Sequence, residues 1–124
     1  LKEFDSKQIE NLLWSSLDMK KIVKSGQGKQ LTDLLRGRTF VAIFQKKSTR
    51  TRLAFEAGAH HLGAKAIFCN KDDIHLGVNE SVKDTGLVVS RLTDVIVARV
   101  YEHSLLEELN QYSVMNKVPI INAL

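Results

Sequence analysis

The sequence predicts an α/β fold with three layers, in which helices cover both faces of a roughly four-stranded parallel sheet. Two observations predict this class. Short runs of apolar and β-branched residues recur along the chain, at 39–44, 64–69, 94–100 and 118–124. Between these runs stand longer segments with helical periodicity, so that strands and helices alternate as they do in a parallel sheet with helical crossovers.

The chain opens with a predicted helix over residues 6–24. Its apolar residues recur every three or four positions and share one face: Ile9, Leu12, Leu13, Leu17 and Ile22. Ser6 or Asp5 is the expected N-cap, because a short polar side chain accepts a hydrogen bond from the first turn. The segment "SGQGKQ" at 25–30 then breaks the helical pattern.

The first predicted strand, "TFVAIF" at 39–44, is short, apolar and β-branched, as expected of a strand that is covered on both faces. A helix begins near Thr49, continues to about His61 and ends at Leu62-Gly63. Further helices are expected between the remaining strands, at 81–92 and 104–114.

Length and charge limit the interpretation further. The 124 residues predict one domain, and the chain stops after the fourth strand without a closing helix, which suggests a larger protein cut at a domain boundary. The net charge of +4 permits a phosphate ligand, but the chain has no Lys/Arg-rich run, which disfavours nucleic acid. No apolar run approaches about 18 residues, so no membrane segment is expected.

The chain has a single cysteine, Cys69, which cannot form an internal disulfide and therefore favours a reducing compartment. It also lacks the neighbouring Cys and His residues that a metal site needs. The histidines at 60, 61, 75 and 103 are too scattered to suggest a ligand set. No metal site is expected.

The segment "FQKKSTRTRLAFEAG" at 44–58 crowds cations and hydroxyls where the first strand gives way to a helix. Ligands of open parallel sheets bind beyond the carboxyl ends of the strands, and the first N–H groups of a helix attract anions. Ser48, Thr49 and Thr51 can donate hydroxyl hydrogen bonds. Arg50 can hold a phosphate through two parallel N–H bonds. The segment therefore predicts a site for a small, highly charged oxyanion.

The residues alone equally allow a simpler interpretation, in which Ser48 or Thr49 caps the helix and the arginines are solvated. Neither a Walker A loop nor a Gly-x-Gly-x-x-Gly turn is present, which disfavours nucleotides. Arg52 lies about 200° around the helix from Arg50. It is therefore predicted to be structural and to pair with Glu56, four residues later.

The run Ser48-Thr49-Arg50-Thr51-Arg52, followed by Phe55-Glu56, resembles the carbamoyl-phosphate signature of the aspartate and ornithine carbamoyltransferases. Further landmarks follow in the family's order: "DIHLGVNES" at 73–81, "DT" at 84–85, "ARVYEHS" at 98–104 and "VPIINAL" at 118–124. Together they cover nearly all of the chain. The loop that contains His75, Leu76 and Gly77 resembles the ornithine branch of the family, and particularly its animal, mitochondrial members.

The resemblance implies that residues 1–124 are the amino-terminal, carbamoyl-phosphate-binding domain of a two-domain enzyme that works as a homotrimer. The family's phosphate cradle corresponds to Ser48, Thr49, Arg50 and Thr51. Arg99 matches a second arginine, which contacts the phosphate and the carbamoyl oxygen, so Arg50 and Arg99 are the expected catalytic residues. The position of Arg99 at a strand's carboxyl end supports this independently, with a solvated arginine as the alternative. His75 matches a residue that reaches into the neighbouring subunit's site.

The implied reaction is attack of the δ-amino group of ornithine on the carbamoyl carbon, which gives citrulline and phosphate in arginine biosynthesis and the urea cycle. It requires no metal or organic cofactor. The ornithine-binding residues belong to the missing second domain, so this chain alone is expected to be inactive. The mitochondrial matrix is the compartment implied by the animal enzymes, with the cytoplasm otherwise.

Three alternatives remain open. The amine acceptor could be aspartate, putrescine or an acylated ornithine, because the missing domain chooses it. The chain could instead be a non-catalytic anion-binding domain of the same fold. A basic nucleic-acid binder is the third alternative, and steep salt dependence of its affinity would identify it.

Some residues depart from the family's pattern. Gln45 stands where glutamate is usual, which removes a carboxylate beside the cradle. Gly86 stands where alanine is common, and Ala123 where glycine is common, at the predicted exit from the domain. Trp14 and Tyr101 are predicted to be packing residues.

Overall fold

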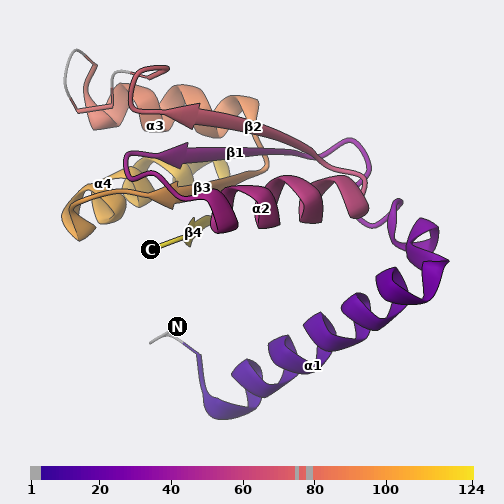
Figure 1. Cartoon of the computed structure of the whole chain (residues 1–124). Coiled ribbons are helices and arrows are strands. Elements are labelled where there is room, and N and C mark those ends of the chain that lie inside the picture. Colours follow the sequence, from indigo (N-terminus) through magenta and orange to yellow (C-terminus); the bar gives the residue numbers. More distant parts are fainter. Residues whose placement is uncertain (1–3, 75, 78–79) are drawn as a thin grey trace.

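The computed structural model describes residues 4–74, 76–77 and 80–124. Within these residues one sheet of four parallel strands has the order β2-β1-β3-β4 (Figure 1). The strands are β1 (Thr39–Phe44), β2 (Lys65–Asn70), β3 (Val95–Arg99) and β4 (Ile120–Asn122). The predicted α/β class is confirmed, and the first strand has the predicted bounds.

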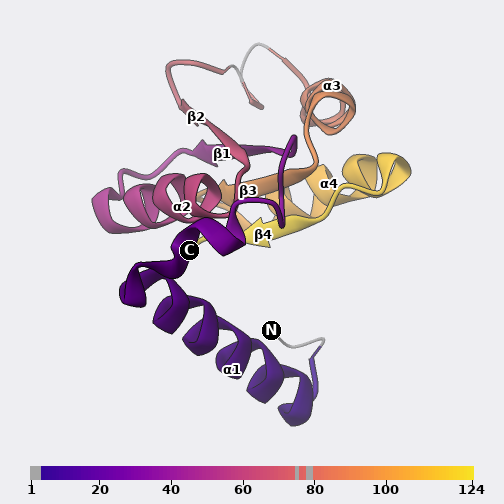
Figure 2. The ribbon, with the colours of Figure 1, turned by 90° about the vertical axis from the view of Figure 1, so that its right-hand side faces the viewer.

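Helices cover both faces of the sheet, as predicted (Figure 2). The α-helices of the described part are α1 (Ser6–Ile22), α2 (Thr49–His61), α3 (Val82–Leu92) and α4 (His103–Ser113). The end of α2 is also as predicted. Gly63 there has φ of 84°, and a Cβ atom at this position would overlap the carbonyl oxygen of Thr32.

Alternate side chains of β1 enter two separate hydrophobic clusters. Val41 and Ile43 pack in one cluster with residues of α3 and α4. Ala42 and Phe44 face the other side of the sheet and pack with Phe55 of α2. Because both faces of β1 are buried, its register is fixed, and so is the position of the loop that follows it.

The first helix lies apart from the sheet layers (Figure 1) and has no buried residue. Leu13, on its predicted apolar stripe, is 61% exposed. The prediction that Trp14 is a packing residue is wrong, since it is 56% exposed and its Nε1 donates to Glu10 at 3.3 Å. Local bonds hold the start of α1: Asp5 accepts from the Gln8 N–H at 2.8 Å, and Gln8 accepts from the Asp5 N–H at 2.9 Å.

The first helix ends at Ile22, earlier than predicted. The chain continues through a π-helical turn over Val23–Gln27 and a 3-10 turn over Gly28–Leu31. Gly26 has φ of 81°, a left-handed conformation that interrupts the helix. The break predicted at 25–30 is therefore present. Hydrophobic periodicity could not reveal the turn types, because they depend on backbone conformation.

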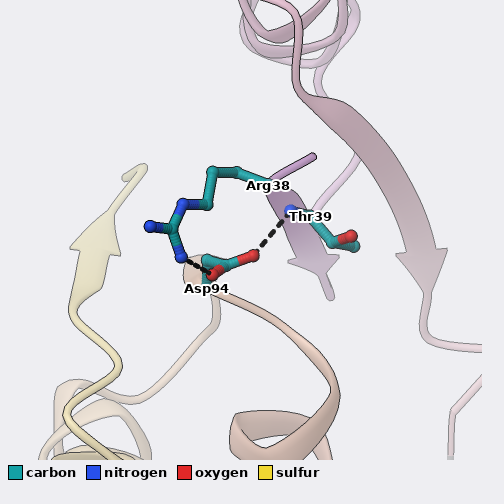
Figure 3. A network of polar contacts seen from close by, with 3 residues as sticks. All are labelled: Arg38, Thr39 and Asp94. Atoms are coloured by element: carbon teal, nitrogen blue, oxygen red, sulfur yellow. Dashed lines mark hydrogen bonds and ion pairs between the residues drawn. The ribbon is translucent and has the colours of Figure 1, made fainter. Parts of the chain in front are cut away.

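Asp94 joins the amino ends of β1 and β3 (Figure 3). Its carboxylate accepts hydrogen bonds from the Thr39 N–H at 2.8 Å and from Arg38 Nη1 at 2.7 Å. The Thr39 bond first, and then the Arg38 bond, hold the pKa of Asp94 below its usual value of 3.8. At the amino ends of β1 and β3, Arg38 and Asp94 are therefore paired within the fold.

Candidate functional site

The carboxyl ends of β1 and β3 lie side by side, with Phe44 paired to Arg99. The chain leaves β1 toward α2 on one face of the sheet and leaves β3 toward α4 on the other face. Ligands of open α/β sheets bind at such a switch point, where neighbouring loops diverge and leave a crevice. The strand order therefore places the predicted cradle at the switch point of the sheet.

The cradle residues Ser48–Thr51 form the start of α2. Ser48 is the N-cap, with an extended backbone (φ −158°, ψ 107°), but its side chain makes no capping hydrogen bond. The first regular bond of this helix runs from the Arg52 N–H to the Ser48 carbonyl, at 3.4 Å. The N–H groups before Arg52 have no partner within the helix, so they point out of its end.

At the start of α3, in contrast, the N-cap side chain does make a capping hydrogen bond. Its N-cap is also a serine, Ser81, whose Oγ accepts from the Asp84 N–H at 3.0 Å and donates to the Asp84 carboxylate at 2.6 Å. Asp84 also places a negative charge in the first turn, where the helix dipole favours it. The first turn of α2 contains no acidic residue and instead carries Arg50. A cation there is repelled by the dipole, and a bound anion would offset that repulsion.

The two arginines of the motif differ in their contacts. Arg52 pairs with Glu56, Nε to Oε1 at 3.1 Å, as predicted, and its guanidinium lies 4.1 Å from the centre of the Phe68 ring. Arg50 is exposed, and no acidic residue of the described chain lies within ion-pair distance of it. Arg52 therefore has an acidic partner within the fold although its side chain is 50% exposed, whereas Arg50 has no acidic partner among the described residues.

Arg99 is half-buried at the end of β3. Its Nη1 donates to the Ala123 carbonyl at 2.7 Å, beside the end of β4. Its Nε is buried and has no hydrogen-bond partner among the described residues. A buried donor without a partner is unfavourable, and an anion or a water molecule could satisfy it.

A cavity of about 640 Å³ opens beside the cradle. Its lining includes Ser48, Thr49 and the two preceding lysines, together with Arg52, Phe68 and Tyr101 and one carboxylate, that of Asp72. The other predicted site residues, Arg50, Thr51 and Arg99, do not line it. The structure thus brings the start of α2 and the end of β3 to one edge of the sheet, but not into one closed pocket. His75 lies outside the described residues.

Tyr101 is one residue whose role sequence reasoning missed. It is 61% exposed, which makes its prediction as a packing residue wrong. Its ring lies 5.1 Å from Lys46 Nζ, and its N–H donates to the side chain of Gln45 at 3.0 Å. The only signal in the sequence was its place two residues beyond the predicted strand-end arginine.

Within the described residues, neither the free cysteine nor the metal-ligating residue types form a second candidate site. Burial, and then the nearby charge of Asp73, raise the pKa of the Cys69 thiol on β2, so it stays protonated at neutral pH. Among the described residues, no three His, Cys, Asp or Glu side chains gather closely enough to hold a metal ion. None of the described helices is long and apolar enough to cross a membrane.

Comparison with known proteins decides the family. Residues 1–124 match the family model described as the carbamoyl-phosphate-binding domain of aspartate/ornithine carbamoyltransferase. The chain belongs to the aspartate/ornithine carbamoyltransferase family. The resemblance seen in the sequence motifs is thereby confirmed.

Individual members of this carbamoyltransferase family resemble the chain over its whole length. "Ornithine carbamoyltransferase, mitochondrial" from Aquarana catesbeiana is 45% identical over 124 residues, and ornithine carbamoyltransferase from Campylobacter fetus is 44% identical over 124 residues. The chain spans 34% and 38% of the lengths of these relatives. The solved ornithine carbamoyltransferase from Pyrococcus furiosus is 40% identical, with a TM-score of 0.91 over 100% of this chain and 38% of that one.

Proposed function

We propose that this chain binds carbamoyl phosphate through Ser48, Thr49, Arg50 and Thr51 at the start of α2 and through Arg99 at the end of β3. The observation that carries the proposal is the start of α2, where the first N–H groups have no partner within the helix and Arg50 has no acidic partner among the described residues. Backbone N–H groups, hydroxyls and a guanidinium are the donors that a phosphate dianion requires. Family membership supports carbamoyl phosphate among the possible oxyanions.

In the proposed reaction, the unprotonated δ-amino nitrogen of ornithine attacks the carbamoyl carbon. The bond from that carbon to the phosphate oxygen breaks, and citrulline and phosphate form. Negative charge grows on the carbamoyl oxygen and on the departing phosphate, so donors fixed before the reaction lower its barrier. In this proposal Arg50 opposes charge on the phosphate, and Arg99 opposes charge on both groups.

The rest of the machinery is proposed to lie outside this chain. We assign residues 1–124 to the carbamoyl-phosphate domain and ornithine binding to a second domain, consistent with relatives about three times as long. His75 is proposed to enter the site of a neighbouring subunit in a homotrimer. The 124-residue chain is therefore expected to bind carbamoyl phosphate without forming citrulline.

The proposed pathway is arginine biosynthesis or the urea cycle, and the proposed compartment is the mitochondrial matrix. The name of the Aquarana catesbeiana relative supports a mitochondrial protein. The relative from the bacterium Campylobacter fetus, at nearly the same identity, supports the cytoplasmic alternative. Fractionation of the source cells, followed by immunodetection of the protein, distinguishes the two.

Aspartate is the main alternative acceptor, since the family description covers both aspartate and ornithine enzymes. The relatives compared above are named as ornithine enzymes, which favours ornithine. The carbamoyl-phosphate site proposed for this chain is the same in either case.

Calorimetric titration of the chain with carbamoyl phosphate tests the proposal. Saturable binding at one site per chain is expected, and acetyl phosphate, which lacks the carbamoyl nitrogen, serves as the comparison ligand. The proposal fails if a folded sample gives no saturable heat with carbamoyl phosphate. It also fails if affinity is governed by salt alone and is equal for the two ligands.

A further inference from the structure

Gln45, the first residue after β1, joins the two loops of the site through two hydrogen bonds. Its main-chain N–H donates to the Arg99 carbonyl at 2.9 Å. Its side-chain Oε1 accepts from the Tyr101 N–H at 3.0 Å. One residue therefore contacts the β3 loop on both sides of Val100. The two bonds fix where the chain carrying Arg99 lies relative to the start of the cradle.

A third contact reinforces this link. Lys46 Nζ lies 5.1 Å from the centre of the exposed Tyr101 ring, within the range of a cation–π interaction. The two residues that open the 45–48 loop thus both contact the loop that follows Arg99. The two contacts with Tyr101 lie beyond the paired strands, whose register ends at Phe44 and Arg99.

We propose that Gln45 is a positioning residue, which holds the cradle loop and the Arg99 loop at the spacing that carbamoyl phosphate requires. The inference rests on the proposed function, because it assumes that both loops contact one ligand. The main-chain bond to Arg99 would persist with almost any residue at position 45. The side-chain bond to Tyr101 depends on the acceptor oxygen of Gln45.

The surroundings of this bond favour positioning over stabilisation of the fold. Tyr101 is exposed and lies outside both hydrophobic clusters. In the pairing of β1 with β3, Gln45 takes part only through its main-chain N–H, which is bonded to the Arg99 carbonyl, and not through its side chain. Loss of the Gln45 side-chain bond should therefore leave the fold in place and loosen the relation between the two loops.

The test compares two ligands in three variants of the chain. Q45M keeps the length of the side chain and removes the acceptor, whereas Q45E keeps an acceptor and adds a negative charge. Q8M is the matched control, since Gln8 also accepts from a backbone N–H, that of Asp5, but far from the site. Dissociation constants for carbamoyl phosphate and inorganic phosphate are measured by calorimetry, and thermal unfolding is recorded for each variant.

Q45M is expected to raise the dissociation constant of carbamoyl phosphate about fivefold, which corresponds to the loss of one hydrogen bond. The dissociation constant of inorganic phosphate should rise less than about twofold. Inorganic phosphate lacks the carbamoyl oxygen, so it depends less on where Arg99 lies. Q45E should restore the wild-type ratio of the two dissociation constants, while its added negative charge lowers the affinity for both ligands alike. Q8M should leave both constants unchanged.

Three results would overturn the inference while leaving the proposed function standing. Q45M could bind both ligands as the wild type does, it could weaken both equally, or it could lose cooperative unfolding. The last two would assign Gln45 a purely structural role. A wild-type chain that folds but does not bind carbamoyl phosphate would overturn the proposed function itself, and the inference with it.

Discussion

At the amino ends of β1 and β3, Asp94 is bonded to Arg38 at 2.7 Å and to the Thr39 N–H at 2.8 Å (Figure 3), whereas at the carboxyl ends Arg50 has no acidic partner among the described residues. Both ends carry charged side chains beside the same two strands. At one end the fold supplies both members of the Arg38–Asp94 pair. At the other end Arg50 and the first N–H groups of α2 have no such partner among the described residues.

This difference distinguishes charged side chains that stabilise the fold from charged side chains that are available to bind a ligand. A paired, partly exposed carboxylate contributes modestly to stability and offers nothing to an anion. Unpaired cations beside a helix start contribute little to the fold and create a positive potential. Substitutions at the amino end should therefore change stability alone, and substitutions at the carboxyl end should change affinity alone.

The largest expected effect is that of Arg50→Ala. Removing a charge-assisted contact of two hydrogen bonds should lower the affinity for carbamoyl phosphate by roughly a hundredfold or more and leave the melting temperature unchanged. Calorimetric titration measures the affinity. The control is Arg36→Ala, which removes another exposed arginine, one that pairs with Asp33 away from the site. Equal affinity in Arg50→Ala and the wild type would remove Arg50 from the site.

The serine N-caps of α2 and α3 differ in the same way, since only Ser81 makes a capping hydrogen bond. Ser81→Ala removes a capping bond, so it should lower the free energy of unfolding by about 1 kcal/mol and leave ligand affinity unchanged. Ser48→Ala removes no capping bond, so it should leave the free energy of unfolding unchanged and lower the affinity for carbamoyl phosphate about fivefold. Urea unfolding and calorimetry of both variants are the measurements. A loss of stability in Ser48→Ala would show that the serine is merely a cap.

Asp94→Ala should have the opposite signature to Arg50→Ala. It removes both bonds that join the starts of β1 and β3, and because the pair is partly exposed, the expected loss is about 1 kcal/mol in unfolding free energy. Carbamoyl phosphate affinity should stay within error of the wild type. Any substantial loss of affinity would mean that the two ends of the sheet are coupled.

The smallest effect is the pH dependence that Asp94 contributes. The pKa of this carboxyl is lower in the folded chain than its usual value of 3.8. The ionised form therefore stabilises the fold above about pH 4, and that contribution is lost as pH falls through the folded pKa. Melting temperatures of the wild type and Asp94→Asn should differ at pH 6 and converge toward pH 2.5. A difference that is constant with pH would assign the effect to packing.

Local patterns predicted much of the fold and part of the site. The bounds of β1 followed from its unbroken apolar run, and the Arg52–Glu56 pair followed from helical spacing. The start of α2 followed from the break between "FVAIF" and "STRTR". Each depends on residues within one or two helical turns, where sequence separation and spatial distance agree.

Long-range contacts could not be predicted in this way. Gln45 and Tyr101 are 56 positions apart, and neither residue type predicts the hydrogen bond between them. The apolar stripe of α1 correctly predicted a helix, but such a pattern does not identify the surface that covers it. Leu12, Leu13 and Leu17 are exposed here, and Ile9 and Ile22 are only partly buried. Tyr101 was wrongly predicted to be a packing residue for a similar reason, because an aromatic side chain is buried only when a partner surface lies nearby.

The most direct test of the comparison is a titration of the isotopically labelled chain with carbamoyl phosphate, followed through backbone amide shifts, with sodium chloride of equal ionic strength as control. The amides of Thr49, Arg50 and Thr51 and of the Arg99 loop should move most, in a saturable way. Those of Thr39 and Asp94, at the other end of the same strands, should stay in place. Shifts that are largest at Thr39 and Asp94, or that sodium chloride reproduces, would contradict the account.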